Sequence, residues 1–421
     1  MFWRVLNSPD SGPGKTRGRG LDAWQNFGRS LVGDDAEKLR GASRAERGGR
    51  LARPIEALRR GEVEEPQCLG HVGHAEHATM RHCFFTAAKE LPTEIHAYRL
   101  DLESGDLVDL TPETGGHAVN FRKDMSFFID GWSDVDSTPR FLLRNCEGTI
   151  LRQFNGSSDD RIEYVGGTST EFLEVPSGNE QPMDAMLIKP PNFDPSQKYP
   201  VLVHVYAGPQ APRVRNRFGG TQSLWHQMLA QQGYVIWICD NQSASYRSVK
   251  QAWPIHQNFA VNELADIERG VAWLKKHAWV DDERIGIWGW SYGGYMTAYA
   301  MTHSDTFKMG ISGAPVTDWK NYDSIYTERY MGLPNENPDG YSKASVLNGK
   351  ASELKGDLLL IHGTIDDNVH LNNTVQFVKE LQDAGKQFDL MLYPGNRHSI
   401  RDEKQSAHLR KLMTEFIHEH L

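Results

Sequence analysis

The stretch Gly289-Trp290-Ser291-Tyr292-Gly293 follows the apolar run 284–288 and precedes a run of helix formers over 296–301. A serine between two glycines at a strand-to-helix junction is typical of a nucleophile elbow, in which a sharp turn raises the hydroxyl clear of the sheet. The two glycines leave room that a Cβ atom would fill. The following helix points backbone N–H groups at the position of an oxyanion. The pattern therefore predicts a serine hydrolase.

Two later loops contain the acid and the base that such a serine needs, in the chain order Ser, Asp, His. A strand predicted over 357–361 leads into Asp366 and Asp367, and a strand predicted over 388–393 leads into His398. Parallel strands place their active-site loops at the carboxyl edge of the sheet, so we expect the three loops to converge there. From the residues alone, either aspartate could be the acid.

Strands and helices alternate through the second half of the chain, which predicts an α/β fold with a doubly wound, mostly parallel sheet. We expect this catalytic domain to span 159–421. Its further strands are predicted at 201–206, 234–239, 284–288 and 309–312, and its helices at 262–276, 371–384 and 403–418.

This half of the chain resembles the catalytic domain of the dipeptidyl-peptidase-IV branch of the prolyl oligopeptidases, through the motifs at 205–209, 289–295, 322–332 and 362–370. The resemblance implies an α/β-hydrolase fold that uses no metal and no cofactor. It implies Ser291 as nucleophile, His398 as general base and Asp366, rather than Asp367, as the acid that orients the imidazole. The implied oxyanion donors are the Tyr292 backbone N–H and the Tyr206 hydroxyl.

The resemblance also implies a pocket for the substrate residue before the scissile bond. Flat aromatic walls and small aliphatic side chains suit a proline or an alanine. We therefore expect a serine peptidase that cleaves peptides after Pro or Ala through an acyl-enzyme, although aromatic residues such as Trp319 can equally belong to the core. The implied substrate-binding residues are Val316, Trp319, Tyr322, Tyr326, Asn368 and Val369.

The sequence departs from the family in its apparatus for the substrate's amino terminus. Relatives grip that amine with two adjacent glutamates of a β-propeller, and the surroundings of Glu64-Glu65 do not resemble that segment. Gln242 also stands where relatives usually carry an arginine. Two alternatives therefore stay open, a less selective esterase or endopeptidase and a catalytically silent fragment.

We interpret residues 86–158 as a remnant of the propeller. Alternation of apolar and polar residues predicts six short strands, at 95–102, 107–111, 118–121, 126–129, 140–145 and 149–154. This amounts to roughly one to one and a half blades, whereas a closed propeller needs at least about four. Exposed strand edges would favour association, and the resemblance to dimeric relatives implies a homodimer.

Residues 1–85 are rich in Gly and Arg without a regular period, which predicts disorder. Arg-Gly runs can bind nucleic acid, but a net charge of −9 argues against a nucleic-acid partner. The spacing of His71, His74, His77, His82 and Cys83 fits no standard zinc pattern, so no metal site is predicted. With no membrane-length apolar stretch and no visible signal peptide, we expect a soluble protein, cytoplasmic by default although relatives are often exported.

Overall fold

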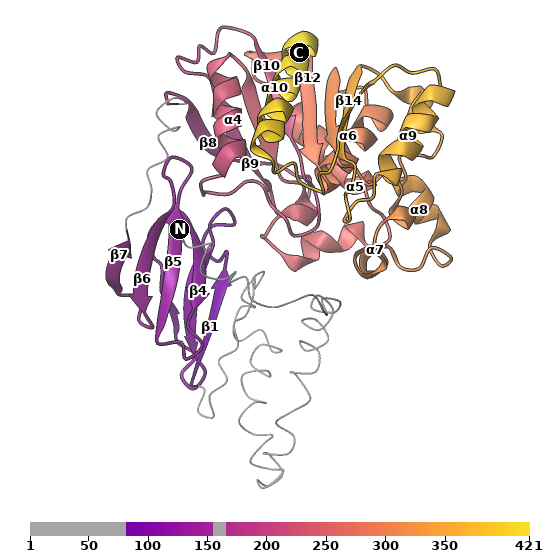
Figure 1. The fold of residues 1–421 in the computed structure, drawn as a ribbon. Coiled ribbons are helices and arrows are strands. Elements are labelled where there is room, and N and C mark those ends of the chain that lie inside the picture. Colours follow the sequence, from indigo (N-terminus) through magenta and orange to yellow (C-terminus); the bar gives the residue numbers. More distant parts are fainter. Residues whose placement is uncertain (1–80, 155–165) are drawn as a thin grey trace, which may run out of the picture. The chain divides into compact units, whose positions relative to one another are not determined.

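The computed structural model describes residues 81–154 and 166–421 (Figure 1). Most of the segment predicted to be disordered, with Glu64-Glu65 and three of the four clustered histidines, lies outside these residues. Among these residues, none of the helices has both the length and the apolar character that a membrane span requires.

In the described part of the chain, seven strands precede the α/β domain and form two antiparallel sheets. The smaller sheet contains β1 (His82–Ala87), β2 (His96–Asp101) and β3 (Leu107–Asp109). The larger is a four-stranded meander, the architecture of one propeller blade. Its strands are β4 (Gly116–Phe121), β5 (Phe127–Ser133), β6 (Arg140–Asn145) and β7 (Ile150–Phe154). All six predicted strands are present, and β1 is an additional one that begins before the expected boundary at residue 86.

The α/β domain is built on one sheet of eight strands in the order β15-β14-β13-β12-β10-β11-β9-β8. The ladders from β11 to β15 are parallel, and β8 and β9 pair antiparallel at the other end. This confirms the predicted doubly wound, mostly parallel sheet. The strands are β8 (Ser169–Val175), β9 (Met183–Lys189), β10 (Tyr199–His204), β11 (Val235–Cys239), β12 (Val280–Trp290), β13 (Met309–Gly313), β14 (Asp357–Gly363) and β15 (Asp389–Tyr393).

Helices cover both faces of this sheet because successive strand residues point to opposite sides. Leu202 and Ile236 belong to the core shared with α4 (Gly220–Gln231) and α10 (Glu403–His420). Val203 and Trp237 belong to the core on the opposite face. That face is covered by α5 (Val261–Leu274), α6 (Tyr292–His303) and α9 (Asn372–Asp383), as Figure 1 shows.

The excursion after β13 carries the helices α7 (Ser324–Met331) and α8 (Pro338–Ala344). Short 3-10 helices lie in the loops, namely η3 (Gln242–Ala244), η4 (Val249–Ile255), η5 (Trp319–Asn321) and η6 (Lys350–Glu353). The loops that follow β10, β11, β12, β14 and β15 all leave the carboxyl ends of their strands, the edge at which open α/β sheets bind ligands.

Candidate active site

Ser291 lies at the junction of β12 and α6 with φ 61° and ψ −118°, a backbone conformation that L-residues rarely adopt. Its N–H donates to the Gly313 carbonyl (2.8 Å), which fixes the turn against the end of β13. A Cβ atom on Gly289 would lie 2.5 Å from the Val205 carbonyl oxygen, and one on Gly293 would collide with the same oxygen. The strand, sharp turn and helix expected of an elbow are therefore present.

Asp366 and His398 meet across the loops that follow β14 and β15. The Nδ1–H of His398 donates to Asp366 Oδ2 at 2.7 Å, since a carboxylate can only accept. The other carboxylate oxygen accepts the backbone N–H groups of Asn368 and Val369 (2.9 and 3.0 Å). The Trp290 indole N–H donates to the His398 carbonyl (2.8 Å), which ties the histidine loop to the residue beside Ser291.

The charge of Asp366 is stabilised by its surroundings. Burial alone would raise the pKa of this carboxyl, but hydrogen bonds from His362 and His398 and from backbone N–H groups lower the pKa well below its usual range. The side chain of His362 is fully buried, and its Nε2 lies 3.3 Å from Asp366 Oδ2. Asp367, in contrast, is exposed and forms an ion pair with Arg397. Of the two aspartates, only Asp366 contacts His398 in the described structure.

Tyr206 and Tyr292 lie side by side, with ring centroids 6.1 Å apart. A Cβ atom on Gly208 would lie 2.6 Å from the Tyr206 ring, so the ring packs onto a position where only glycine fits. Burial raises the pKa of Tyr206, and its hydroxyl therefore stays protonated and able to donate. The Tyr292 N–H is one of the unpaired amides of the first turn of α6.

Glu263, at the start of α5, is a residue of this site that the sequence analysis missed. It is fully buried and accepts the Tyr292 hydroxyl at 2.8 Å. Its other oxygen has no partner among the described residues, and burial raises its pKa to about 7. The sequence does contain one indication of it. Glu263 lies on the same face of the predicted helix as the apolar residues Ile267 and Leu274, where a charged residue is unusual.

Three of the expected substrate-binding residues, Trp319, Tyr322 and Tyr326, form an aromatic cluster. Tyr326 stacks on Trp319 with centroids 6.0 Å apart and meets Tyr322 edge-on at 5.6 Å. The Tyr322 hydroxyl donates to Asn368 Oδ1 (2.8 Å). The amide oxygen of Asn368 is therefore occupied, and its NH₂ group is the part that can donate to a substrate. Tyr322 and Tyr326 pack against a core that includes the buried residues Val316, Trp319 and Val369.

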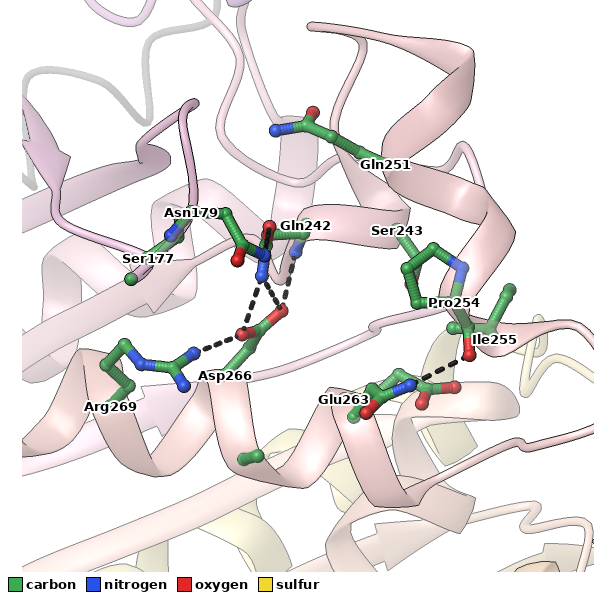
Figure 2. A pocket seen from close by; sticks show the side chains of 13 residues that line it. Ser177, Asn179, Gln242, Ser243, Gln251, Pro254, Ile255, Glu263, Asp266 and Arg269 are labelled. Atoms are coloured by element: carbon green, nitrogen blue, oxygen red, sulfur yellow. Dashed lines mark hydrogen bonds and ion pairs between the residues drawn. The ribbon is translucent and has the colours of Figure 1, made fainter.

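Gln242 takes part in a polar network that lines a cavity of about 190 Å³ beside α5 (Figure 2). Its amide nitrogen donates to Asp266 (3.1 Å), and its amide oxygen accepts from Asn179 (2.7 Å). Arg269 forms an ion pair with the same aspartate at 2.5 Å. Glu263, which accepts the Tyr292 hydroxyl, lines the same cavity as Gln242 and Asp266.

Comparison with known proteins gives two family matches. Residues 221–421 match the prolyl oligopeptidase family, and residues 52–139 match the dipeptidyl peptidase IV N-terminal region. The second match begins before the boundary expected for the propeller remnant.

Individual relatives agree with these matches. Human dipeptidyl peptidase 8 is 33% identical over 80% of this chain and 39% of its own length. The probable dipeptidyl-aminopeptidase B of Emericella nidulans is 35% identical over 75% of this chain and 36% of its own. The crystal structure of Porphyromonas gingivalis dipeptidyl peptidase 4 superposes with a TM-score of 0.77 at 32% identity, over 84% of this chain and 50% of that one.

The chain thus spans less than half the length of the curated relatives it matches. The family matches include β1 to β5 of the antiparallel sheets and β11 to β15 of the α/β sheet, with its elbow. Residues 221–421 belong to the prolyl oligopeptidase family, and the chain resembles its dipeptidyl peptidase IV branch.

Proposed function

We propose that this protein is a serine peptidase that hydrolyses peptide bonds after Pro or Ala through an acyl-enzyme on Ser291. The observation that carries the proposal is the 2.7 Å hydrogen bond between His398 and Asp366 on loops at the same sheet edge as the elbow. That contact holds the imidazole in the tautomer with a free Nε2, which is the form able to take a proton from a serine.

In the proposed reaction, His398 removes the Ser291 proton as the hydroxyl attacks the peptide carbonyl. The imidazolium is stabilised by Asp366, which remains ionised because of its lowered pKa. Tyr206 and the Tyr292 N–H donate to the oxyanion. His398 then gives its proton to the leaving amine. In the second half of the reaction, water attacks the acyl-enzyme while His398 takes its proton, and His398 returns that proton to Ser291 as the ester bond breaks.

The aromatic cluster supplies the preference for the residue before the scissile bond. Tyr322 and Tyr326 present flat rings backed by Trp319, and a rigid apolar ring such as proline loses little entropy between them. Asn368 is assigned to a peptide carbonyl of the substrate. Peptides are the proposed partners, and a homodimer is proposed by similarity to dimeric relatives.

The activity is tested with chromogenic dipeptide substrates that end in Pro or Ala, each offered with a free and with a blocked amino terminus. Faster cleavage after Pro and Ala than after Leu would support the assignment of the pocket. A blocked substrate cleaved as fast as the free one would favour the less selective esterase or endopeptidase. Absence of any turnover by folded protein would favour the silent fragment and contradict the proposal.

A further inference from the structure

A second cavity, of about 170 Å³, lies beside α4 and is lined by three arginines, Arg213, Arg215 and Arg217. They alternate along an irregular segment with Pro212, Val214 and Asn216, and all three arginines line the same cavity. The carboxylate of Asp240 holds this segment by accepting the backbone N–H groups of Arg213 and Val214 (2.9 and 2.8 Å).

Within the described residues, none of the three guanidinium groups forms an ion pair with a carboxylate. Arg213 lies over the Tyr206 ring at 4.1 Å, and Arg215 donates to the Tyr246 hydroxyl at 3.2 Å. Other arginines of the chain do have such partners, for example Arg247 with Asp184. Three like charges around one cavity repel one another and create a positive potential that attracts an anion.

The inner end of the cavity carries a buried, unsatisfied polar atom. His226 is 2% exposed, and its Nε2 has no hydrogen-bond partner among the described residues. Burial and the nearby charge of Arg410 lower the pKa of His226 to about 3, so the imidazole is neutral at physiological pH. A neutral imidazole with a proton on Nε2 can donate to an entering oxygen. The cavity thus combines cationic side chains at its mouth with a further donor inside.

Arg213 connects this cavity to the proposed oxyanion site, because it lines the cavity and its guanidinium lies over the Tyr206 ring. The C-terminal carboxylate of a peptide is always on the leaving-group side of the scissile bond. A cationic cavity next to Tyr206 is therefore suited to hold that carboxylate.

We propose that Arg213, Arg215 and Arg217 form a subsite for the C-terminal carboxylate of a short peptide substrate, on the leaving-group side of the scissile bond. The inference rests on the proposed peptidase function. Guanidinium groups recognise carboxylates by paired, charge-assisted hydrogen bonds, and such contacts weaken as salt screens them where they are exposed. The subsite selects peptides that end shortly after the cleaved bond.

The test compares a tripeptide with proline in the second position, having a free C-terminal carboxylate, with the same tripeptide as its C-terminal amide. We expect the wild type to cleave the acid with a kcat/KM roughly tenfold higher than that of the amide, and the ratio to fall with added salt. The double substitution Arg215→Gln with Arg217→Gln should reduce the ratio to about one. Arg213 is left in place because its loss would also disturb Tyr206.

The matched control is Arg152→Gln, which removes an exposed guanidinium from β7 and should leave the ratio as in the wild type. Equal cleavage of acid and amide by the wild type would overturn the inference. A preference for the acid that survives the double substitution would overturn it as well.

A binding measurement separates this inference from the peptidase proposal. Calorimetric titration of the Ser291→Ala protein with the tripeptide acid should show binding that the amide lacks and that the double arginine substitution removes, whether or not the wild type is an active peptidase. Binding of inorganic phosphate without binding of the tripeptide acid would identify a site for free anions and overturn the peptide assignment.

Discussion

The α/β sheet and the blade-like sheet of this protein differ in how their strands are covered. All five residues of β13, in the interior of the eight-stranded sheet, are buried. All five residues of β7, the last strand of the four-stranded meander, are exposed, and Leu151 keeps 50% of its surface accessible. The first sheet has helices on both faces, whereas the second presents apolar residues such as Phe141 to its surroundings.

The two regions therefore differ in how far each is stabilised by its own core. The α/β sheet completes its own core, and its loops bring Asp366 to His398 without help from the preceding sheets. The blade-like sheet resembles one part of a ring whose neighbours would cover it. We therefore expect catalytic chemistry to be a property of the α/β domain, and association to be a property of the blade.

We expect the most severe loss of activity from a substitution at the first of the two adjacent aspartates. Replacing Asp366 by Asn removes the carboxylate that holds the His398 Nδ1–H, so kcat should fall by about four orders of magnitude, as expected for loss of the correct tautomer. The measurement is steady-state hydrolysis of a proline dipeptide substrate.

Asp367→Asn is the matched control for that substitution. Asp367 is exposed and pairs only with Arg397 among the described residues, and exposed ion pairs contribute little. Its kcat should stay within about threefold of the wild type. Equal losses in the two variants would refute the assignment of Asp366.

The next effect concerns the oxyanion donor. Tyr206→Phe deletes a hydroxyl but keeps the ring beside Tyr292, so kcat should fall by about a hundredfold while KM changes little. Tyr199→Phe removes a hydroxyl that accepts the Asp194 N–H at the opposite end of β10 and should not change kcat. A Tyr206→Phe enzyme with wild-type kcat would exclude the hydroxyl from the reaction.

A smaller effect concerns the pH dependence of stability. The pKa of Glu263 is raised to about 7 from an ordinary value of 4.5, so the folded protein keeps a proton that the unfolded chain releases between these values. The contribution of Glu263 to the stability of the folded state is therefore fully present below about pH 4.5 and is lost as pH rises through 7. Asp240, whose pKa burial also raises to about 7, adds to the same trend.

Glu263→Gln keeps an acceptor for the Tyr292 hydroxyl and removes the titration. Its Tm should fall a few degrees less than that of the wild type between pH 5 and pH 8, with the remaining decline owed in part to Asp240. Glu336→Gln, at an exposed position, should follow the wild type. Identical pH profiles for the wild type and Glu263→Gln would show that Glu263 is ionised throughout this range.

The smallest effect on catalysis is expected from the blade. Leu151→Lys places a charge on β7, and charges on exposed strands oppose edge-to-edge association. Concentration-dependent association should decrease in analytical ultracentrifugation, with kcat unchanged. Leu91→Lys alters an equally exposed leucine outside any strand and should have little effect. Association that persists unchanged in Leu151→Lys would place the contact elsewhere.

The α/β fold could be predicted because its signals are local. The elbow at Ser291, the apolar strand runs and the amphipathic helices each follow from neighbouring residues. The antiparallel strands β8 and β9 were not predicted, because the buried run 183–189 contains acidic Asp184, whose partner Arg247 is distant in sequence. Strand β1 was missed because its residues adjoin a histidine-rich stretch without alternation.

The candidate site was predicted only where its residues lie in recognisable motifs. The hydrogen bond between Tyr292 and Glu263 joins a motif residue to a helix 29 positions earlier, and no local pattern indicates it. The stacking of Arg213 on Tyr206 is likewise visible only in three dimensions. The central residues of the candidate site could therefore be predicted from motifs, whereas the residues that surround them are known only from the packing in the structure.

The most direct test of an intact catalytic centre is labelling with a fluorophosphonate probe, which reacts only with an activated serine. Wild-type protein should be labelled, and both Ser291→Ala and His398→Ala should not, because the probe needs the nucleophile and the base that activates it. Ser352→Ala, at an exposed serine of η6, should be labelled like the wild type. Folded wild-type protein that resists the probe, or a Ser291→Ala protein that accepts it, would contradict the account.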